Sequence, residues 1–258
     1  MFVDVGSSRV FVERFGRGDA VVVGVSGSFG TSEIWHPPFS FLSESCRTVT
    51  YDHLGTGLTF APAEAVTFEQ QVDVLGEIVE LFADGQRCVL AGDSSMTAVT
   101  IEAAYRWPDR FSGLVLVSSG LDFEPTATVE RFVEGLRHAF EPTIDAFVRL
   151  AIPEDTTGNY QNWLKAIIRR TGGDRAAVLV ESFYTVDIRP RLQHIKVPAV
   201  VIHGELDQLP TSPLAASEEI AETIPDARLV VHPGVGHVPT LTNPRPVANE
   251  VATLLTRR

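Results

Sequence analysis

The sequence predicts an α/β fold, in which helices cover both faces of a mostly parallel β-sheet, with an all-helical insertion at about residues 121–190. Short continuous apolar runs alternate with helix-periodic segments in both halves of the chain, and this alternation stops between them. Continuous apolar runs are typical of parallel strands, which are buried on both faces. At 258 residues and 44% hydrophobic content, the chain can bury one large core. We predict that residues 1–120 and 191–258 form it.

The first 120 residues predict a hairpin followed by four buried strands. Alternating polarity around Gly6-Ser7-Ser8 indicates antiparallel strands at residues 2–5 and 10–14. The helix-periodic segments between the later strands include one that runs from Thr67, a candidate N-cap, to Phe82. Others end near Ser43 and Trp107. The apolar runs that predict the four buried strands are residues 20–23, 48–51, 86–91 and 113–117.

The segment from about 121 to 190 predicts four helices with no strand between them. Their expected ranges are 126–140, 142–151, 160–170 and 175–184. From Val197 the alternation returns, and the remaining elements are expected as strand 199–203, helix 213–223, strand 227–231 and helix 244–256. The insertion therefore separates two parts of one sheet.

The charge balance narrows the classes of partner. The formal net charge is −12 at pH 7, and a negative surface repels phosphate backbones and anionic lipids. We expect a small-molecule substrate, with no nucleic acid and no membrane as partner, and the sequence is compatible with a homodimer. No basic region followed by an apolar stretch stands at the N-terminus, so we expect a cytoplasmic protein. Cys46 and Cys88 lie in apolar surroundings and predict buried, reduced thiols.

A serine, an acid and a histidine, which can act together in nucleophilic catalysis, follow three of the predicted strands. Ligands of open parallel sheets bind at the carboxyl ends of the strands, and there the chain has Ser94, Asp207 and His237, in that order. A serine between a strand and a helix is the context of a nucleophile elbow. A serine hydroxyl needs a neighbouring base, and the base needs an orienting acid. Taken alone, Ser94 also fits as the N-cap of the next helix.

Five short motifs in order make the sequence similar to the α/β-hydrolase superfamily, over nearly the whole chain and least in residues 121–190. They are Val-Ser-Gly-Ser-Phe-Gly at 25–30, Asp-His-Leu-Gly-Thr-Gly at 52–57, Ala-Gly-Asp-Ser-Ser-Met at 91–96, Val-Ile-His-Gly-Glu-Leu-Asp at 201–207 and Gly-Val-Gly-His at 234–237. The resemblance implies an α/β-hydrolase fold in which residues 121–190 form a helical cap.

The resemblance also implies roles for individual residues. Ser94 is then the nucleophile, His237 the general base and acid, and Asp207 the residue that orients the imidazole. The oxyanion hole consists of the backbone N–H groups of Ser95 and Ser28, with Phe29 as the adjacent alternative to Ser28. No cofactor is implied. No pair of histidines has convincing metal-ligand spacing, so we expect no metal.

The chain departs from the family pattern beside the nucleophile and in the preceding loop. Ser26-Gly27 stands where the family has His-Gly, and Met96 stands where the elbow has a glycine that lets strand and helix approach. Met96 therefore predicts either a wider crossing or a side chain turned into the substrate pocket. We expect Phe29, Met96 and His53 to line that pocket.

Two assignments have competitors. Asp93 also stands in a small-x-nucleophile-x-small frame, and an aspartate nucleophile is typical of a dehalogenase or epoxide hydrolase; the flanking residues match the family when Ser94 is the nucleophile. Asp122, which follows the strand at 113–117, competes with Asp207 because some relatives carry the acid there.

The predicted function is that of a serine hydrolase acting on an uncharged, largely apolar carboxylic ester or lactone. Aromatic residues of the insertion are expected to face an apolar cavity. The alternatives are a C–C bond hydrolase, a perhydrolase or an Asp93-dependent enzyme on the same fold, and a hydrolase-like ligand receptor.

Overall fold

The computed structural model describes residues 1–256, and its centre is an eight-stranded sheet with the order β1-β2-β4-β3-β5-β6-β7-β8. β1 and β2 pair antiparallel, β2 pairs antiparallel with β4, and all later pairs are parallel. The mostly parallel sheet is confirmed. The strands are β1 (Phe2–Val5), β2 (Ser8–Gly16), β3 (Val21–Val25), β4 (Arg47–Tyr51), β5 (Cys88–Asp93), β6 (Phe111–Val117), β7 (Ala199–Gly204) and β8 (Ala227–His232).

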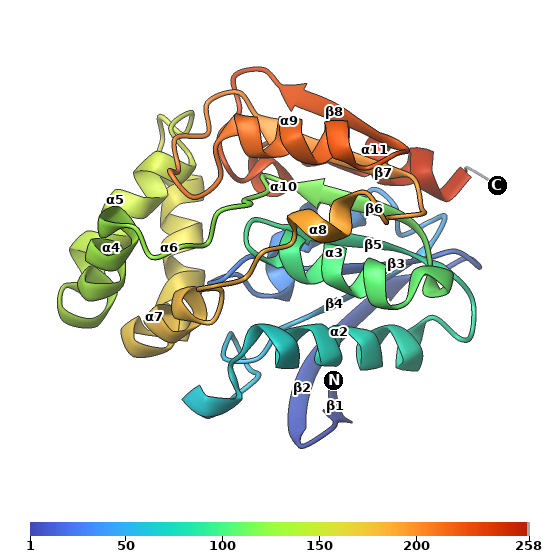
Figure 1. Cartoon of the computed structure of the whole chain (residues 1–258), viewed down its shortest axis with the longest axis horizontal. Helices are drawn as coiled ribbons and strands as arrows, with labels where there is room; N and C mark the ends of the chain where they lie inside the picture. The colour runs from blue at the N-terminus through green and yellow to red at the C-terminus, as the bar shows by residue number, and fades with distance from the viewer. Residues whose placement is uncertain (257–258) are drawn as a thin grey trace.

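Helices cover both faces of the sheet, as Figure 1 shows. In β6, Leu114 and Leu116 pack in one buried cluster, whereas Val115 and Val117 pack in another, because successive side chains of a strand point to opposite faces. The first cluster includes residues of α2 (Phe68–Phe82), α3 (Met96–Arg106), α8 (Arg189–Leu192) and α9 (Leu214–Thr223). The second includes residues of α1 (His36–Ser40) and α11 (Pro244–Thr256).

Four further helices follow β6 and lie together at one end of the sheet, drawn in green to yellow in Figure 1. Their own apolar cluster also contains Phe29, Leu209, Val238 and Leu241, which belong to loops and a short helix after β3, β7 and β8. These helices therefore cover the carboxyl ends of the strands, where the site residues were predicted. They are α4 (Ala127–His138), α5 (Phe140–Ala151), α6 (Asn159–Thr171) and α7 (Gly173–Glu181).

Local signals explain where several elements begin. Thr67 is the N-cap of α2, as predicted, because its side chain accepts the Gln70 N–H at 3.2 Å. The short helices were harder to predict: η1 (Ser32–Trp35) precedes α1, and α10 (Pro239–Thr242) begins at a proline two residues after His237. η2 (Ala63–Ala65) and η3 (Pro108–Arg110) are single 3-10 turns.

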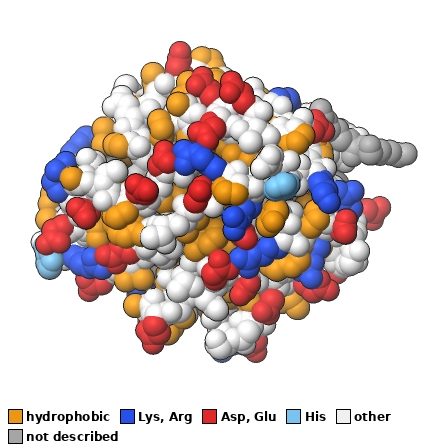
Figure 2. All heavy atoms as spheres, in the orientation of Figure 1, with side chains coloured by type: hydrophobic (Ala, Val, Ile, Leu, Met, Phe, Trp, Pro, Cys, Tyr) orange, Lys and Arg blue, Asp and Glu red, His pale blue; other side chains and the backbone are white. Residues whose placement is uncertain are grey.

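The surface carries charges of both signs. On the face shown in Figure 2, Lys and Arg side chains lie among Asp and Glu side chains. No helix within residues 1–256 is long and apolar enough to cross a membrane. Cys46 and Cys88 are both buried and free in the described chain.

Candidate active site

Ser94 lies at a sharp turn between β5 and α3. Its φ is +54°, a left-handed conformation that is strained in a residue with a Cβ atom. The turn is fixed on both sides, since the Ser94 N–H donates to the Val117 carbonyl at 2.8 Å and the Thr97 hydroxyl donates to the Ser94 carbonyl at 2.7 Å. A Cβ atom on Gly27 would lie 2.7 Å from the Ser94 Cβ atom. Glycine at 27 therefore allows the loop after β3 to approach the turn.

His237 and Asp207 complete a hydrogen-bonded chain from Ser94. His237 Nε2 lies 3.0 Å from Ser94 Oγ, and His237 Nδ1 lies 2.6 Å from Asp207 Oδ2. The three side chains come from the turns and loops after β5, β8 and β7, separated by up to 143 positions in the sequence. The parallel sheet brings together the three residues that the sequence placed after its strands. With Nδ1 protonated, Nε2 is free to accept the proton of Ser94.

Further groups hold the Asp207 carboxyl group. Asp207 Oδ1 accepts the Leu209 N–H at 3.0 Å, and Ser212 Oγ lies 3.5 Å from Asp207 Oδ2 and 3.1 Å from His237 Nδ1. His203 Nε2 is also near, 3.6 Å from Asp207 Oδ2, but makes no hydrogen bond within residues 1–256, and His203 Nδ1 lies 2.9 Å from Ser217 Oγ. Neither Ser212 nor His203 was predicted as part of the site: Ser212 reaches the acid only through the folded loop after β7, whereas His203 lies in β7 itself, four residues before Asp207.

The electrostatics around the two histidines differ. Burial acts to lower the pKa of His237, but the charge and hydrogen bond of Asp207, with the charge of Asp93, outweigh it and raise that pKa. Burial lowers the pKa of His203, although the charge of Asp207 acts the other way. Asp207 therefore stabilises the protonated form of His237, the histidine that faces Ser94.

The predicted oxyanion-hole residues lie together beside Ser94. Ser28 Oγ and Ser95 Oγ are 2.6 Å apart, which joins the loop after β3 to the start of α3. Within residues 1–256, the N–H groups of Ser28, Phe29 and Ser95 make no hydrogen bond. Free N–H groups of this kind can stabilise a negative oxygen that forms next to the serine.

Ser94 and His237 open into a narrow, mostly apolar cavity of about 120 Å³. The Phe29 ring packs edge-on against the Phe147 ring, with centroids 5.5 Å apart, and both line the cavity. Ser28, Ser94, Ser95 and His237 form its polar end. The segment between β6 and β7 supplies seven further apolar lining residues: Phe123, Val129, Phe132, Leu164, Ile168, Val180 and Phe183.

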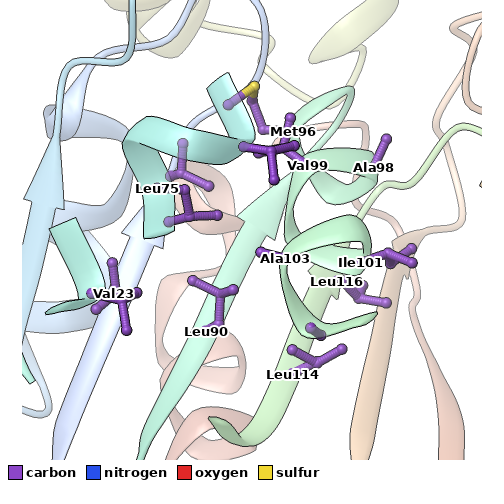
Figure 3. Close-up of a cluster of buried hydrophobic side chains, with 14 of the residues drawn as sticks. Val23, Leu75, Leu90, Met96, Ala98, Val99, Ile101, Ala103, Leu114 and Leu116 are labelled. Carbon is purple, nitrogen blue, oxygen red and sulfur yellow. The ribbon is translucent and has the colours of Figure 1, made fainter. Parts of the chain in front are cut away.

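Two residues predicted to line the pocket lie elsewhere, and those predictions are wrong. Met96 is fully buried in the core cluster with Leu75 and Val99 (Figure 3), because the first turn of α3 directs it toward α2. His53 is buried behind the loop after β3, with Nε2 3.2 Å from the Gly27 carbonyl and Nδ1 3.3 Å from Gln71 Nε2. Burial lowers the pKa of His53 to about 4. It is therefore neutral and supports the loop that holds Ser28.

The two competing acids occupy different environments. Asp122 forms an ion pair with Arg189 at 2.8 Å, and its side chain is 77% exposed, so it does not reach His237. Asp93 lies at the end of β5 and lines the cavity, and its Oδ1 atom is buried with no hydrogen-bond partner in the described chain. Burial raises the pKa of Asp93 to about 6. The strained turn is at Ser94, not at Asp93.

Metal-binding side chains are not grouped in the part of the chain that the structure describes. No three His, Cys, Asp or Glu residues among residues 1–256 are arranged to hold a metal ion.

The chain is similar to known proteins over almost its full length. A family model described as "Alpha/beta hydrolase family" matches residues 21–250. The chain is 27% identical over 252 residues to the pimeloyl-(acyl-carrier protein) methyl ester esterase of Nitrosomonas europaea, covering 92% of this chain and 96% of that one. It is also 27% identical over 266 residues to the karrikin insensitive 2 receptor IA of Petunia hybrida, covering 91% of this chain and 90% of the receptor.

Solved structures give the same result for the fold. An esterase from Exiguobacterium antarcticum superposes with a TM-score of 0.90 at 18% identity, covering 99% of each chain. The enol-lactonase from Burkholderia xenovorans LB400 superposes with a TM-score of 0.83 at 25% identity, covering 100% of each chain.

Proposed function

The chain belongs to the α/β hydrolase family, and from this premise we propose that it is a serine hydrolase that cleaves an uncharged, largely apolar carboxylic ester or lactone through an acyl-enzyme. The observation that carries the proposal is the unbroken relay from Ser94 Oγ to His237 at 3.0 Å and from His237 to Asp207 at 2.6 Å, at the polar end of an apolar cavity.

In the first half of the reaction Ser94 attacks the ester carbonyl carbon. His237 Nε2 takes the serine proton as the new C–O bond forms, and Asp207 stabilises the resulting imidazolium. The carbonyl oxygen becomes negative and receives hydrogen bonds from the N–H groups of Ser95 and of Ser28 or Phe29. The bond to the leaving alkoxide then breaks, and the imidazolium gives that oxygen its proton.

In the second half water releases the acyl group. His237 takes a proton from the water, the oxygen of the water attacks the acyl carbon, and the Ser94 oxygen leaves and regains a proton from the imidazolium. The products are a carboxylic acid and an alcohol, or a hydroxy acid from a lactone. Because the side chains of Asp207 and His237 are buried, water screens the Asp207 charge little and it acts strongly on His237.

The size and lining of the cavity favour a small, uncharged substrate. Its volume of about 120 Å³ is below the range of about 300–1,000 Å³ usual for ligand pockets. Apart from Asp93 and His237, the residues that line it carry no ionisable side chain. The names of the two related enzymes, a methyl ester esterase and an enol-lactonase, fit the same class of bond.

We also treat residues 121–190 as a cap on a core formed by residues 1–120 and 191–258. Residues 121–190 supply eight of the 22 residues that line the cavity, six of them from α4 to α7, and the apolar cluster of these helices also contains Leu209 and Val238 from the loops of the core. The cap then sets the shape of the substrate, while the core carries the reacting groups.

The test is hydrolysis of a panel of p-nitrophenyl esters and lactones of increasing acyl length by the wild type and Ser94→Ala. We expect short, uncharged acyl groups to be turned over, and Ser94→Ala to lose about 10³-fold or more in kcat while it keeps the fold. Ser40→Ala, at an exposed serine of α1, is the matched control and is expected to keep full activity. Turnover that survives in Ser94→Ala would overturn the proposal.

A ligand receptor is the second candidate, because three of the relatives are receptors that the chain matches over 82–90% of their length. A receptor would retain the relay but bind a ligand tightly, with at most one covalent event per molecule. Multiple turnovers per molecule on any member of the panel favour the hydrolase, whereas a single stoichiometric burst favours the receptor.

A further inference from the structure

The loop that carries His237 is fastened to the end of α5. The His237 N–H donates to the Ala151 carbonyl at 2.7 Å, and the neighbouring Gly236 N–H donates to Glu154 Oε1 at 3.0 Å. Gly236 and Glu154 are 82 positions apart in the sequence. The backbone of the general base is therefore held by the helical segment between β6 and β7, not only by the sheet.

One carboxyl oxygen of Glu154 holds the chain on both sides of His237. Besides the Gly236 N–H, Glu154 Oε1 accepts the hydroxyl hydrogen of Thr242 at 2.8 Å. Thr242 ends α10, the short helix that follows His237. Glu154 Oε2 is buried and has no hydrogen-bond partner within residues 1–256. The side chain therefore acts through Oε1, as a bridge across the histidine loop.

The two segments are in close contact. A Cβ atom on Gly236 would lie 2.5 Å from the Ala151 carbonyl oxygen and 2.7 Å from both Glu154 Oε2 and Pro153 Cδ, so only glycine fits there. Val238 and Leu241, on the other side of His237, belong to the same apolar cluster as Ala151 and Ile152. Hydrogen bonds and apolar packing thus fix the histidine loop to this end of α5.

We propose that Glu154 is a positioning residue for the reaction, which holds the backbone of His237 so that its ring reaches Ser94 and Asp207 at the same time. The inference rests on the proposed function, in which His237 is the base. Both ring contacts, 3.0 Å to Ser94 Oγ and 2.6 Å to Asp207 Oδ2, depend on where the loop places the ring. A shift of the α5 end therefore moves the base as well as the cavity wall.

The effect of Glu154 is geometric. The charges that raise the pKa of His237 against its burial are those of Asp207 and Asp93. A neutral side chain of the same shape can still accept hydrogen bonds from Gly236 and Thr242 through its amide oxygen. Glu154→Gln is therefore expected to preserve the position of His237, whereas Glu154→Ala removes both hydrogen bonds.

The experiment measures kcat, KM and the pH profile of kcat/KM with p-nitrophenyl acetate. For Glu154→Ala we expect kcat to fall about 10- to 100-fold, with KM within about threefold, because small misplacements of reacting groups cost rates of this size. The acid limb of kcat/KM should move to lower pH, since a displaced ring loses part of the Asp207 interaction that raises its pKa. Glu154→Gln should stay within about threefold of wild type. The matched control is Glu134→Ala, at an acid of α4 whose side chain is 73% exposed.

Two further measurements keep the proposal testable if Glu154→Ala does not fold. Thr242→Val removes one of the two donors and should lower kcat in the same direction by a smaller factor. NMR of 15N-labelled histidine reports the tautomer and exchange of His237 without any turnover, and should change in Glu154→Ala or Thr242→Val but not in Glu134→Ala.

The proposal is overturned if Glu154→Ala keeps the wild-type kcat, or loses activity with an unmoved acid limb and unchanged His237 resonances. Loss of activity in Glu154→Gln equal to that in Glu154→Ala would also overturn it. Failure of the proposed function appears differently, as turnover that survives in Ser94→Ala. In that case the NMR comparison still decides whether Glu154 holds His237.

Discussion

Asp207→Asn removes the negative charge beside His237 and keeps the size of the side chain. In the wild type, Asp207 Oδ1 accepts the Leu209 N–H at 3.0 Å and Oδ2 lies 2.6 Å from His237 Nδ1. The amide oxygen of asparagine can still accept from Leu209, which directs its NH₂ group toward Nδ1. The NH₂ group is a donor, so Nδ1 becomes the acceptor and the ring proton moves to Nε2. The nitrogen that faces Ser94, His237 Nε2, then already carries a proton and cannot accept the proton of the serine hydroxyl.

The magnitude follows from these contacts. A hydrogen bond to a charged group contributes about 1.5–3 kcal/mol, which corresponds to about 10- to 150-fold in rate. The wrong tautomer adds to this loss, and the corresponding change in other serine triads lowers kcat about 10⁴-fold. Ser212 Oγ lies 3.1 Å from Nδ1 and can accept its proton in part of the molecules. We therefore expect kcat/KM to fall about 10³-fold in Asp207→Asn and further in the double variant Asp207→Asn/Ser212→Ala.

Initial rates with p-nitrophenyl acetate between pH 6 and 9 measure the loss, and thermal unfolding checks the fold. Asp122→Asn is the matched control, because Asp122 pairs with Arg189 at the surface. We expect it to leave kcat/KM unchanged. A loss below about tenfold in Asp207→Asn, or a larger loss in Asp122→Asn, would refute the role of Asp207.

Three further variants test the surroundings of the site. Burial raises the pKa of Asp93 to about 6, so folding favours the neutral carboxyl group. The stability that this group contributes is present below its unfolded pKa near 4 and is lost as the pH rises through 6. At pH 7.5 the wild type therefore holds a buried charge, and Asp93→Asn should raise the unfolding free energy by about 2–3 kcal/mol. Asp93→Asn should also move the acid limb of kcat/KM to lower pH, since the Asp93 charge raises the pKa of His237; denaturant titration and a pH profile measure both effects, and an unmoved limb would exclude this coupling. Because Met96 is fully buried in the core, Met96→Ala should lower the unfolding free energy by about 2–5 kcal/mol and change KM by less than about threefold. A large change in KM without destabilisation would instead indicate that Met96 lines the pocket. Phe147→Ala opens the cavity wall, so kcat/KM for longer p-nitrophenyl esters should rise up to about fourfold per added methylene; an unchanged optimum across the acyl series would count against the cavity as the acyl site.

The sequence was sufficient for the parts of the fold that depend on local pattern. Apolar runs such as residues 113–117 lie within buried parallel strands because a strand covered on both faces has no polar side. The strained Ser94 turn was readable for a similar reason, since a strand and a helix meet there without a linker. Asp207 and His237 were found because parallel strands place their carboxyl ends at one edge of the sheet, so residues that follow the strands come together.

The misplaced residues depend on packing between distant segments. Whether Met96 points into the cavity or into the core is decided by α2, which leaves room for it beside Leu75. His53 follows a strand like the site residues do, but the hydrogen bonds to Gly27 and Gln71 turn it behind the loop. Glu154 carries no local signal, because its partners Gly236 and Thr242 are reached only in the folded chain.

The most direct test of the central claim is labelling with a fluorophosphonate, followed by mass spectrometry. The reagent reacts with an activated serine, and trypsin releases residues 88–106 as one peptide that contains both Ser94 and Ser95. We predict one stoichiometric adduct, assigned by fragmentation to Ser94, that forms much more slowly in Asp207→Asn and is absent in Ser94→Ala. An adduct on another residue, or hydrolysis that continues in an enzyme without a reactive Ser94, would contradict the account.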